Sequence, residues 1–171
     1  MKDLRQMIRR KQALIHCITN PISMTQCANA VLAMGARPMM AEHPEEVEEI
    51  TATAGALLLN LGNISDVRME AMRRSLKTAK EYQIPVVLDA VGVACSALRR
   101  NFAMELLAEE AVTVIKGNYS EITALYDSNY HSSGVDADKA LCIDRTAERA
   151  MALSEKYHAG ILASGAKDLV A

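Results

Sequence analysis

The sequence predicts an α/β protein with a parallel sheet and helices on both of its faces. Short apolar runs alternate with longer amphipathic segments along the chain, which is typical of parallel strands connected by helices. The runs are continuously hydrophobic, as in strands that are buried on both faces. Half of the 171 residues are hydrophobic, so a single domain over residues 1–171 can bury a sizeable core.

Each predicted strand is a short apolar run, and each predicted helix lies between two such runs. The strands are ALIHCI (13–18), RPMM (37–40), ALLLNL (56–61), PVVLDA (85–90), VTVIKG (112–117) and GILAS (160–164). The helices are expected over 22–34, 44–53, 65–82, 96–109, 119–126 and 144–158. Residues 126–138, YDSNYHSSGVDAD, form the one clear flexible loop.

Local signals mark the helix boundaries. Gly35 follows the apolar stripe of 22–34 and is typical of a residue that ends a helix. Pro44 suits the first position of a helix, and the acids after it suit the positive end of the helix dipole. Ser65 is a predicted N-cap for 65–82.

Charge and cysteine spacing exclude several classes of function. Net charge is −2, from 19 basic and 21 acidic residues, and no long run of one sign favours nucleic acid or an anionic membrane as partner. No apolar window reaches the roughly 18 residues that a membrane span needs, and the charged N-terminus differs from a secretory signal. The four cysteines lack zinc spacing, which predicts free thiols and a cytoplasmic location.

Polar residues follow the predicted strands at the point where each strand ends. In open α/β sheets, ligands bind outside the carboxyl ends of the strands. The polar and glycine residues at these ends are Thr19, Asn20, Asn60, Gly62, Asp89, Lys116, Asn118, Glu121 and Ser164. The sequence therefore predicts a ligand site along this rim.

The charged members of this set suit phosphate chemistry. Asp89 and Glu121 supply the oxygen ligands that Mg²⁺ prefers, and Lys116 is a cation suited to phosphate oxygens. Gly92 and the small residues after it let backbone N–H groups approach an anion. Phosphoryl transfer uses these parts to neutralise charge.

Each candidate also has a structural interpretation. Asp89 is equally consistent with capping the next helix, and NYSE at 118–121 resembles a capping box that would occupy Glu121. Lys116 is consistent with a solvated lysine, Ser164 with a turn residue, and His16 with a hydrogen-bonded core histidine. Because no Walker A, G-x-G-x-x-G or H-E-x-x-H motif occurs, spacing alone indicates an α/β ligand-binding domain or a phosphotransferase.

From about residue 13 onward, the chain resembles the hydroxyethylthiazole kinase family of the ribokinase-like superfamily. The resemblance rests on HCITNPISMTQCANAVLAMGARPMMAEHPEEVEEI, GALLLNLG, IPVVLDAVG, VIKGNYSEI and GILASG. It implies transfer of the γ-phosphate of ATP, with Mg²⁺, to the hydroxyl of 4-methyl-5-(2-hydroxyethyl)thiazole in thiamine biosynthesis or salvage. It also implies a homo-oligomer, a trimer with thiazole pockets at subunit interfaces.

The resemblance implies roles for residues on the alcohol side of the site. Met40 in RPMMAEHPEE matches a methionine that contacts the thiazole, although paired methionines are also typical core residues. Asn20 and Gly62 match further positions of the thiazole pocket.

It likewise implies roles on the phosphate side. Lys116, at a position where the family often has arginine, Asn118 and Ser164 are expected to bind ATP. Asp89 and Glu121 match the acids of the Mg²⁺ and phosphate region and are the expected catalytic and metal-binding residues. The loop after Asp89 reads DAVGVACS where the family commonly has DPVGAGAT.

The end of the sequence also differs from the family pattern. The chain stops at SGAKDLVA without the glycine-rich GTGC-type segment, so we expect an incomplete domain that is inactive when tested alone. GILAS would become an exposed sheet edge if no strand pairs beyond it. Two alternatives are a non-catalytic protein that binds the thiazole or an oligomer partner, and a kinase for another small alcohol.

Overall fold

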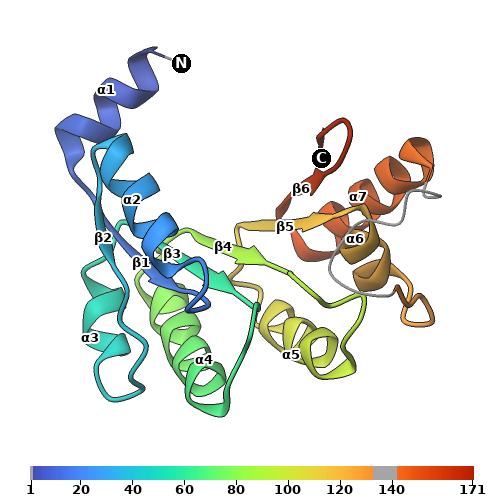
Figure 1. Ribbon diagram of the computed structural model, residues 1–171, viewed down its shortest axis with the longest axis horizontal. Helices are drawn as coiled ribbons and strands as arrows, with labels where there is room; N and C mark the ends of the chain where they lie inside the picture. The colour runs from blue at the N-terminus through green and yellow to red at the C-terminus, as the bar shows by residue number, and fades with distance from the viewer. Residues whose placement is uncertain (1, 133–141) are drawn as a thin grey trace. The chain divides into compact units, whose positions relative to one another are not determined.

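The computed structural model describes residues 2–132 and 142–171 (Figure 1). The chain divides into two compact units, residues 1–86 and 87–171. The predicted loop over 126–138 falls partly outside the described residues.

Three parallel strands form the sheet of the first unit, in the order β2-β1-β3. Their bounds are Leu14–Ile18 for β1, Arg37–Met39 for β2 and Ala56–Asn60 for β3. His16 in the middle of β1 is paired with Met39 on one side and Leu57 on the other. This register brings the ends of the strands, and the loops that follow them, to one edge of the sheet.

Helices cover both faces of these strands, as predicted. They are α1 (Lys2–Lys11), α2 (Met24–Met34), α3 (Val47–Ala52) and α4 (Asp66–Glu81). The connection from β1 to β2 runs across the sheet in one direction and the connection from β2 to β3 returns, so right-handed crossovers place α2 and α3 on opposite faces. Helices α3 and α4 lie together on one face and α2 on the other (Figure 1).

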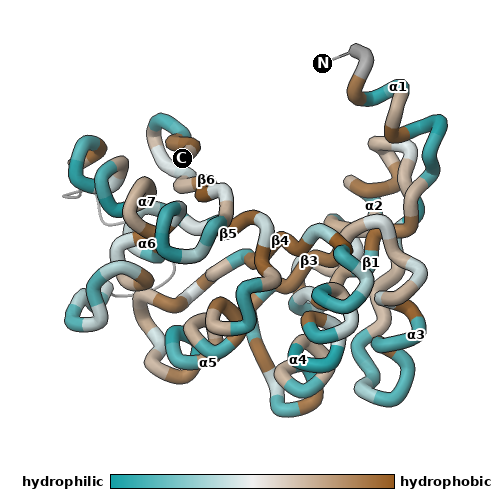
Figure 2. The backbone as a smooth tube through the Cα atoms, turned by 180° about the vertical axis from the view of Figure 1, so that it is seen from behind, coloured by the Kyte–Doolittle hydropathy of each residue, from teal (hydrophilic) through white to brown (hydrophobic). Residues whose placement is uncertain are grey.

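Helix α4 shows why its sequence forms a core helix. Its N-cap Ser65 accepts a hydrogen bond from the Arg68 N–H, and its inner side buries Ala71, Met72, Leu76 and Ala79. Met72 and Leu76 are fully buried, which contributes about 1.5–3 kcal/mol for each side chain. Along α4, hydrophobic and hydrophilic residues alternate (Figure 2).

The apolar side of α2 is not covered in the same way, since α2 contains no buried residue. An apolar cavity of about 490 Å³ lies between α1, α2 and the start of β1. Helix α1 was not predicted from the sequence, although Leu4, Met7 and Ile8 have helical spacing and line this cavity. The cavity lies at the amino end of β1, and none of the candidate site residues lines it.

Among the described residues of the second unit, three strands are parallel and one short strand is antiparallel. The order is β4-β5-β6-β7, with bounds Val86–Asp89, Val114–Asn118, Gly160–Ser164 and Leu169–Val170. GILAS is not left as a sheet edge, because β7 pairs with β6 on the side away from β5. The residues after Ser164 turn back and bring the chain alongside β6.

The helices of the second unit are α5 (Ala97–Ala108), α6 (Tyr119–Tyr126) and α7 (Ile143–Tyr157). Helices α6 and α7 pack against each other, and α7 packs on β6. Helix α5 begins after Ser96, whose hydroxyl accepts from the Arg99 N–H. Its buried Arg100 donates to the carbonyl oxygens of Val93 and Ser128, which holds residues 128–130 against the loop after β4.

The predicted α/β class is thus confirmed. Each end of a predicted strand lies within two residues of the corresponding end of the observed strand. That the two units form a single domain stays a prediction. Among the described residues, no helix is long and apolar enough to cross a membrane.

Candidate functional site

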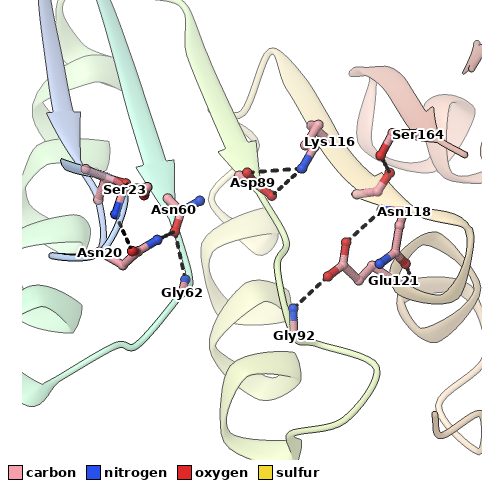
Figure 3. Close-up of polar contacts among 12 residues, drawn as sticks. Asn20, Ser23, Asn60, Gly62, Asp89, Gly92, Lys116, Asn118, Glu121 and Ser164 are labelled. Atoms are coloured by element: carbon pink, nitrogen blue, oxygen red, sulfur yellow. Dashed lines mark hydrogen bonds and ion pairs between the residues drawn. The ribbon is translucent and has the colours of Figure 1, made fainter. Parts of the chain in front are cut away.

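In the first unit, a network of neutral hydrogen bonds joins the loop after β1 to the loop after β3. The Asn20 side-chain amide donates to Asn60 Oδ1 at 3.1 Å, and the Gly62 N–H donates to the same oxygen at 2.9 Å. Asn20 Oδ1 in turn accepts from the Ser23 N–H at 3.0 Å. Figure 3 shows these groups converging at the strand ends. The arrangement presents amide groups without a net charge.

Gly62 is required by the closeness of this network. A Cβ atom at this position would lie 2.8 Å from both Asn20 Nδ2 and Asn60 Oδ1. Such contacts are too short for a carbon atom, so any side chain would force the two asparagines apart. The glycine therefore permits the network to form.

His16 fixes the loop that follows β2. The ring is fully buried, with Nδ1 2.8 Å from Thr51 Oγ1 and Nε2 3.0 Å from the Ala41 carbonyl oxygen. Burial lowers the pKa of His16 from its ordinary value, while the Ala41 carbonyl and the charge of Glu46 act in the opposite direction. The interpretation of His16 as a hydrogen-bonded core histidine is confirmed. Its partner Ala41 directly follows Met40, which is half-buried.

A buried arginine reaches the same loop from α4. Arg68 Nε lies 3.2 Å from Glu42 Oε2, and Arg68 Nη1 donates to the Asn63 carbonyl oxygen at 2.7 Å. The contact with Glu42 is an ion pair without hydrogen-bond geometry, since neither atom has a hydrogen-bond partner. Arg68 thus contacts the loops after β2 and β3 together.

In the second unit, Asp89 and Lys116 form an ion pair between neighbouring strands. They face each other in the β4–β5 register, and Lys116 Nζ lies 3.2 and 3.3 Å from the two carboxylate oxygens of Asp89 (Figure 3). The capping interpretation of Asp89 is wrong, because the N-cap of α5 is Ser96. Lys116 is not simply solvated, because its ammonium group forms an ion pair with the Asp89 carboxylate.

Glu121 has both of its carboxylate oxygens engaged by backbone donors. Oε2 accepts from the Asn118 N–H at 2.7 Å, and Asn118 Oδ1 accepts from the Glu121 N–H at 2.9 Å, which completes the predicted capping box. Oε1 accepts from the Gly92 N–H at 2.8 Å (Figure 3). Burial raises the pKa of the Glu121 carboxyl, and the negative charge of Asp89 acts in the same direction. The backbone N–H groups of Asn118 and Gly92 act in the opposite direction and lower it.

Gly92 makes this contact possible through its backbone conformation. Its φ is +80°, in the left-handed region that favours glycine. A Cβ atom here would also meet Arg99 Nη1 at 2.2 Å. The small residues after Asp89 therefore leave room for a buried carboxylate on one side and a guanidinium on the other.

Asn118 and Ser164 lie at the adjacent strand ends. They are opposite each other in the β5–β6 register, and Ser164 Oγ donates to the Gly117 carbonyl oxygen at 3.3 Å. The Asn118 side chain caps α6. The structure thus places the predicted ATP-binding residues on two neighbouring strands, and their roles stay predictions.

The donor set of the second unit fits Mg²⁺ only as part of a larger ligand set. Within residues 2–132 and 142–171, no group of three or more His, Cys, Asp or Glu side chains could hold a metal ion. Mg²⁺ commonly takes one or two carboxylates together with phosphate oxygens and water, and Asp89 lies near enough for its charge to raise the pKa of Glu121. They would hold the ion together with nucleotide phosphates.

The predicted residues fall into two groups, one in each unit. Asn20, Met40 and Gly62 lie on the loops after β1, β2 and β3, and the phosphate-side residues lie on or just after β4, β5 and β6. The roles of Asn60 and Arg68 were missed. For Asn60, its position at the end of an apolar strand could have indicated a role in the site. For Arg68, nothing in the local sequence distinguishes it from the other arginines of α4.

Comparisons with known proteins show which family the chain resembles over almost its whole length. Residues 5–171 match the Hydroxyethylthiazole kinase family. The hydroxyethylthiazole kinase of Finegoldia magna is 42% identical over 170 residues, which cover 99% of this chain and 63% of the relative. Hydroxyethylthiazole kinase 2 of Clostridium botulinum is 45% identical over 173 residues, which cover 98% of this chain and 65% of the relative. The chain thus spans less than two thirds of the length of these relatives.

Solved structures confirm the predicted ribokinase-like fold. The structure of a hydroxyethylthiazole kinase protein from Pyrococcus horikoshii superposes with a TM-score of 0.87 at 30% identity, and covers 100% of this chain and 64% of its own. A structure described as the last common ancestor of HMPPK and PLK/HMPPK vitamin kinases has a TM-score of 0.65 at 18% identity, over 93% of this chain and 80% of its own. The second similarity concerns the fold alone.

Proposed function

Because this chain belongs to the hydroxyethylthiazole kinase family, we propose that the whole protein transfers the γ-phosphate of ATP to the hydroxyl of 4-methyl-5-(2-hydroxyethyl)thiazole. The observation that carries this proposal is the separation of two chemistries. Neutral amides and a methionine gather in the first unit, and an ion pair and a buried carboxylate gather at the strand ends of the second. We assign alcohol binding to the first and phosphate binding to the second.

The alcohol-binding residues suit an uncharged aromatic ring. The flexible, polarisable side chain of Met40 can pack against the thiazole. Asn20 is held by Asn60 and by the Ser23 N–H, so its amide is oriented before the substrate binds. Preorganised polar groups of this kind fix the orientation of a small ligand in a largely apolar pocket.

The phosphate-binding residues neutralise charge during the transfer. The substrate hydroxyl oxygen forms a bond to the γ-phosphorus and its proton is released to water, while the bond to the bridging oxygen breaks and ADP leaves with its electron pair. Lys116 would move from Asp89 toward the phosphate oxygens, which carry the larger negative charge. Ser164 and Asn118 would contact ATP from the adjacent strands.

Asp89 and Glu121 would hold Mg²⁺, which would supply further neutralisation of phosphate charge when bound. Asp89 would serve the metal in addition to its contact with Lys116. Glu121 would act through Gly92, whose N–H it holds at 2.8 Å. A trimeric assembly, which the family resemblance implies, and a cytoplasmic location, which the charged N-terminus and the cysteine spacing predict, belong to the same proposal.

The proposal is tested with the full-length protein, ATP, Mg²⁺ and the thiazole alcohol in a coupled assay of ADP release. We expect ADP release to depend on the thiazole alcohol. Other small alcohols should compete only weakly with the thiazole alcohol for the enzyme. Thiazole binding without ADP release would instead support the non-catalytic alternative. Preference for a different alcohol would assign the protein to another small-molecule kinase activity.

A further inference from the structure

Arg68 stands out because it is a buried cation in an unfavourable place. It is the third residue of α4, in the first turn, where the helix dipole favours acids over bases. It is also 7% exposed, and arginine is seldom buried without partners that compensate its charge. A residue that breaks two local rules at once usually has a role beyond the stability of its own helix.

The contacts of Arg68 show what that role is. Its Nε atom lies 3.2 Å from Glu42 Oε2, and its Nη1 atom donates to the Asn63 carbonyl oxygen at 2.7 Å. Asn63 adopts a left-handed backbone conformation with φ +47°, which is uncommon for a residue with a side chain. One rigid guanidinium therefore connects the loop after β2 to a turn after β3.

Both connected loops carry residues that we assign to the alcohol site. Glu42 follows Met40 by two positions, and Asn63 directly follows Gly62. The Gly62 turn is in turn tied to Asn20 through the shared oxygen of Asn60. A single guanidinium thus contacts both the loop that carries the methionine and the turn that belongs to the amide network.

We propose that Arg68 is a positioning residue of the thiazole site, which sets the spacing between the loop of Met40 and the turn of Gly62. It does not touch the substrate in this proposal, and acts through those two loops. The inference rests on the assignment of thiazole binding to the first unit. It adds a residue that determines how well the pocket fits its alcohol.

The test is calorimetry on the full-length protein with the thiazole alcohol and, separately, with ATP. Arg68→Lys keeps the charge but cannot make both contacts, because one ammonium replaces a two-pronged fork. We expect Arg68→Lys to raise the Kd for the thiazole about tenfold, equivalent to ~1.4 kcal/mol. The Kd for ATP should stay within about twofold, the scatter expected for an uncoupled site.

Glu42→Gln provides a second variant that leaves the core intact, since the Glu42 side chain is 40% exposed. It should weaken thiazole binding by a smaller factor, and should weaken it no further in an Arg68→Lys background. Such non-additivity in binding shows that the two side chains act as one unit. Additive effects would overturn the proposed connection.

Arg74 provides the matched control on the same helix. It donates to the Pro44 carbonyl oxygen at 3.2 Å and pairs with Glu45, and so contacts the same loop further from Met40 without reaching the turn of Gly62. Arg74→Lys should leave the thiazole Kd unchanged. If Arg68→Lys and Glu42→Gln also leave it unchanged while the parent protein binds thiazole, the role of Arg68 is refuted. If the parent protein does not bind thiazole, both this inference and the proposed function fail.

Discussion

The candidate site residues of the first unit are held by hydrogen bonds between neutral groups, whereas those of the second unit include an ion pair and a buried carboxylate. Asn20 and Gly62 both donate to the side-chain oxygen of Asn60. In contrast, the Asp89 carboxylate and the Lys116 ammonium form an ion pair. Neutral hydrogen bonds change little with salt, whereas partly exposed charges are screened by it. The strand ends of each unit thus provide a different environment, suited to an uncharged alcohol in the first unit and to a phosphate chain in the second.

The difference also concerns how each group is held in place. Glycine permits a close approach in both units, at Gly62 for two side-chain amides and at Gly92 for a buried carboxylate. In the first unit the loops are connected to each other by His16 and Arg68. In the second unit Asp89 and Lys116 lie directly opposite each other on neighbouring strands, so the sheet register brings this pair together.

The largest expected effect comes from the charged region. In the full-length protein, Asp89→Asn should lower kcat about 100-fold or more, the scale for removing one electrostatic contributor to a transition state. The Kd for the thiazole should not change, because Asp89 belongs to the other group. Steady-state kinetics and calorimetry measure the two quantities.

Asp89→Asn should also leave the melting temperature almost unchanged. The Lys116 side chain is 36% exposed, and ion pairs exposed to this degree contribute less than about 1 kcal/mol. A variant that unfolds, while the folded fraction keeps normal turnover, would show that Asp89 is a structural residue.

The next effect belongs to the neutral region. Met40→Ala should weaken thiazole binding by about 1–3 kcal/mol, the scale for a lost buried apolar contact, and should leave ATP binding unchanged. Met39→Ala is the matched control, since Met39 is 38% exposed and lies within β2. Equal effects of the two substitutions on the thiazole Kd would remove Met40 from the site.

A pH-dependent effect is expected from His16. Burial lowers its pKa in the folded protein below 6.5, so the unfolded chain binds the proton more readily than the folded one. The free energy of unfolding should therefore be constant above about pH 6.5 and fall as the pH drops below it, by at most about 1.4 kcal/mol per pH unit.

Urea unfolding at pH 7.5, 6.5 and 5.5 measures this dependence. His16→Gln keeps one donor and one acceptor without a titrating ring, and should flatten the curve in this range. The parent protein and the His16→Gln variant have the same other histidines, and all of these are exposed: His43, His131 and His158. Identical pH dependence in the two would exclude His16 as its source.

The smallest effect separates the two regions by ionic strength. Raising the salt concentration from 50 to 200 mM should weaken ATP binding a few-fold, since the Debye length shortens from about 14 to 7 Å. Thiazole binding should change by less than about twofold, because its partners are neutral. Calorimetric titrations at the two concentrations measure both, and equal salt dependence would contradict the division.

Local sequence determined most of the elements and their ends. Ser65 and the Asn118–Glu121 capping box act over three residues, so their signals lie within one turn of the chain. The apolar runs indicated which segments are buried, and hence where each strand ends. Asn20, Gly62, Asp89 and Ser164 could each be found at or just after the end of a strand for this reason. The short strand β7 escaped prediction because two residues carry no pattern.

Only the tertiary structure decided which of these groups meet. Lys116 reaches Asp89 across 27 positions, and Glu121 holds Gly92 across 29, through strand register and helix packing that no local signal specifies. Arg68 looks like any arginine of an exposed helix until the loops after β2 and β3 fold against it. The sequence thus determined which residues stand at the rim, because burial and capping are local properties. The partners of those residues were decided by packing, because they depend on elements far apart in the chain.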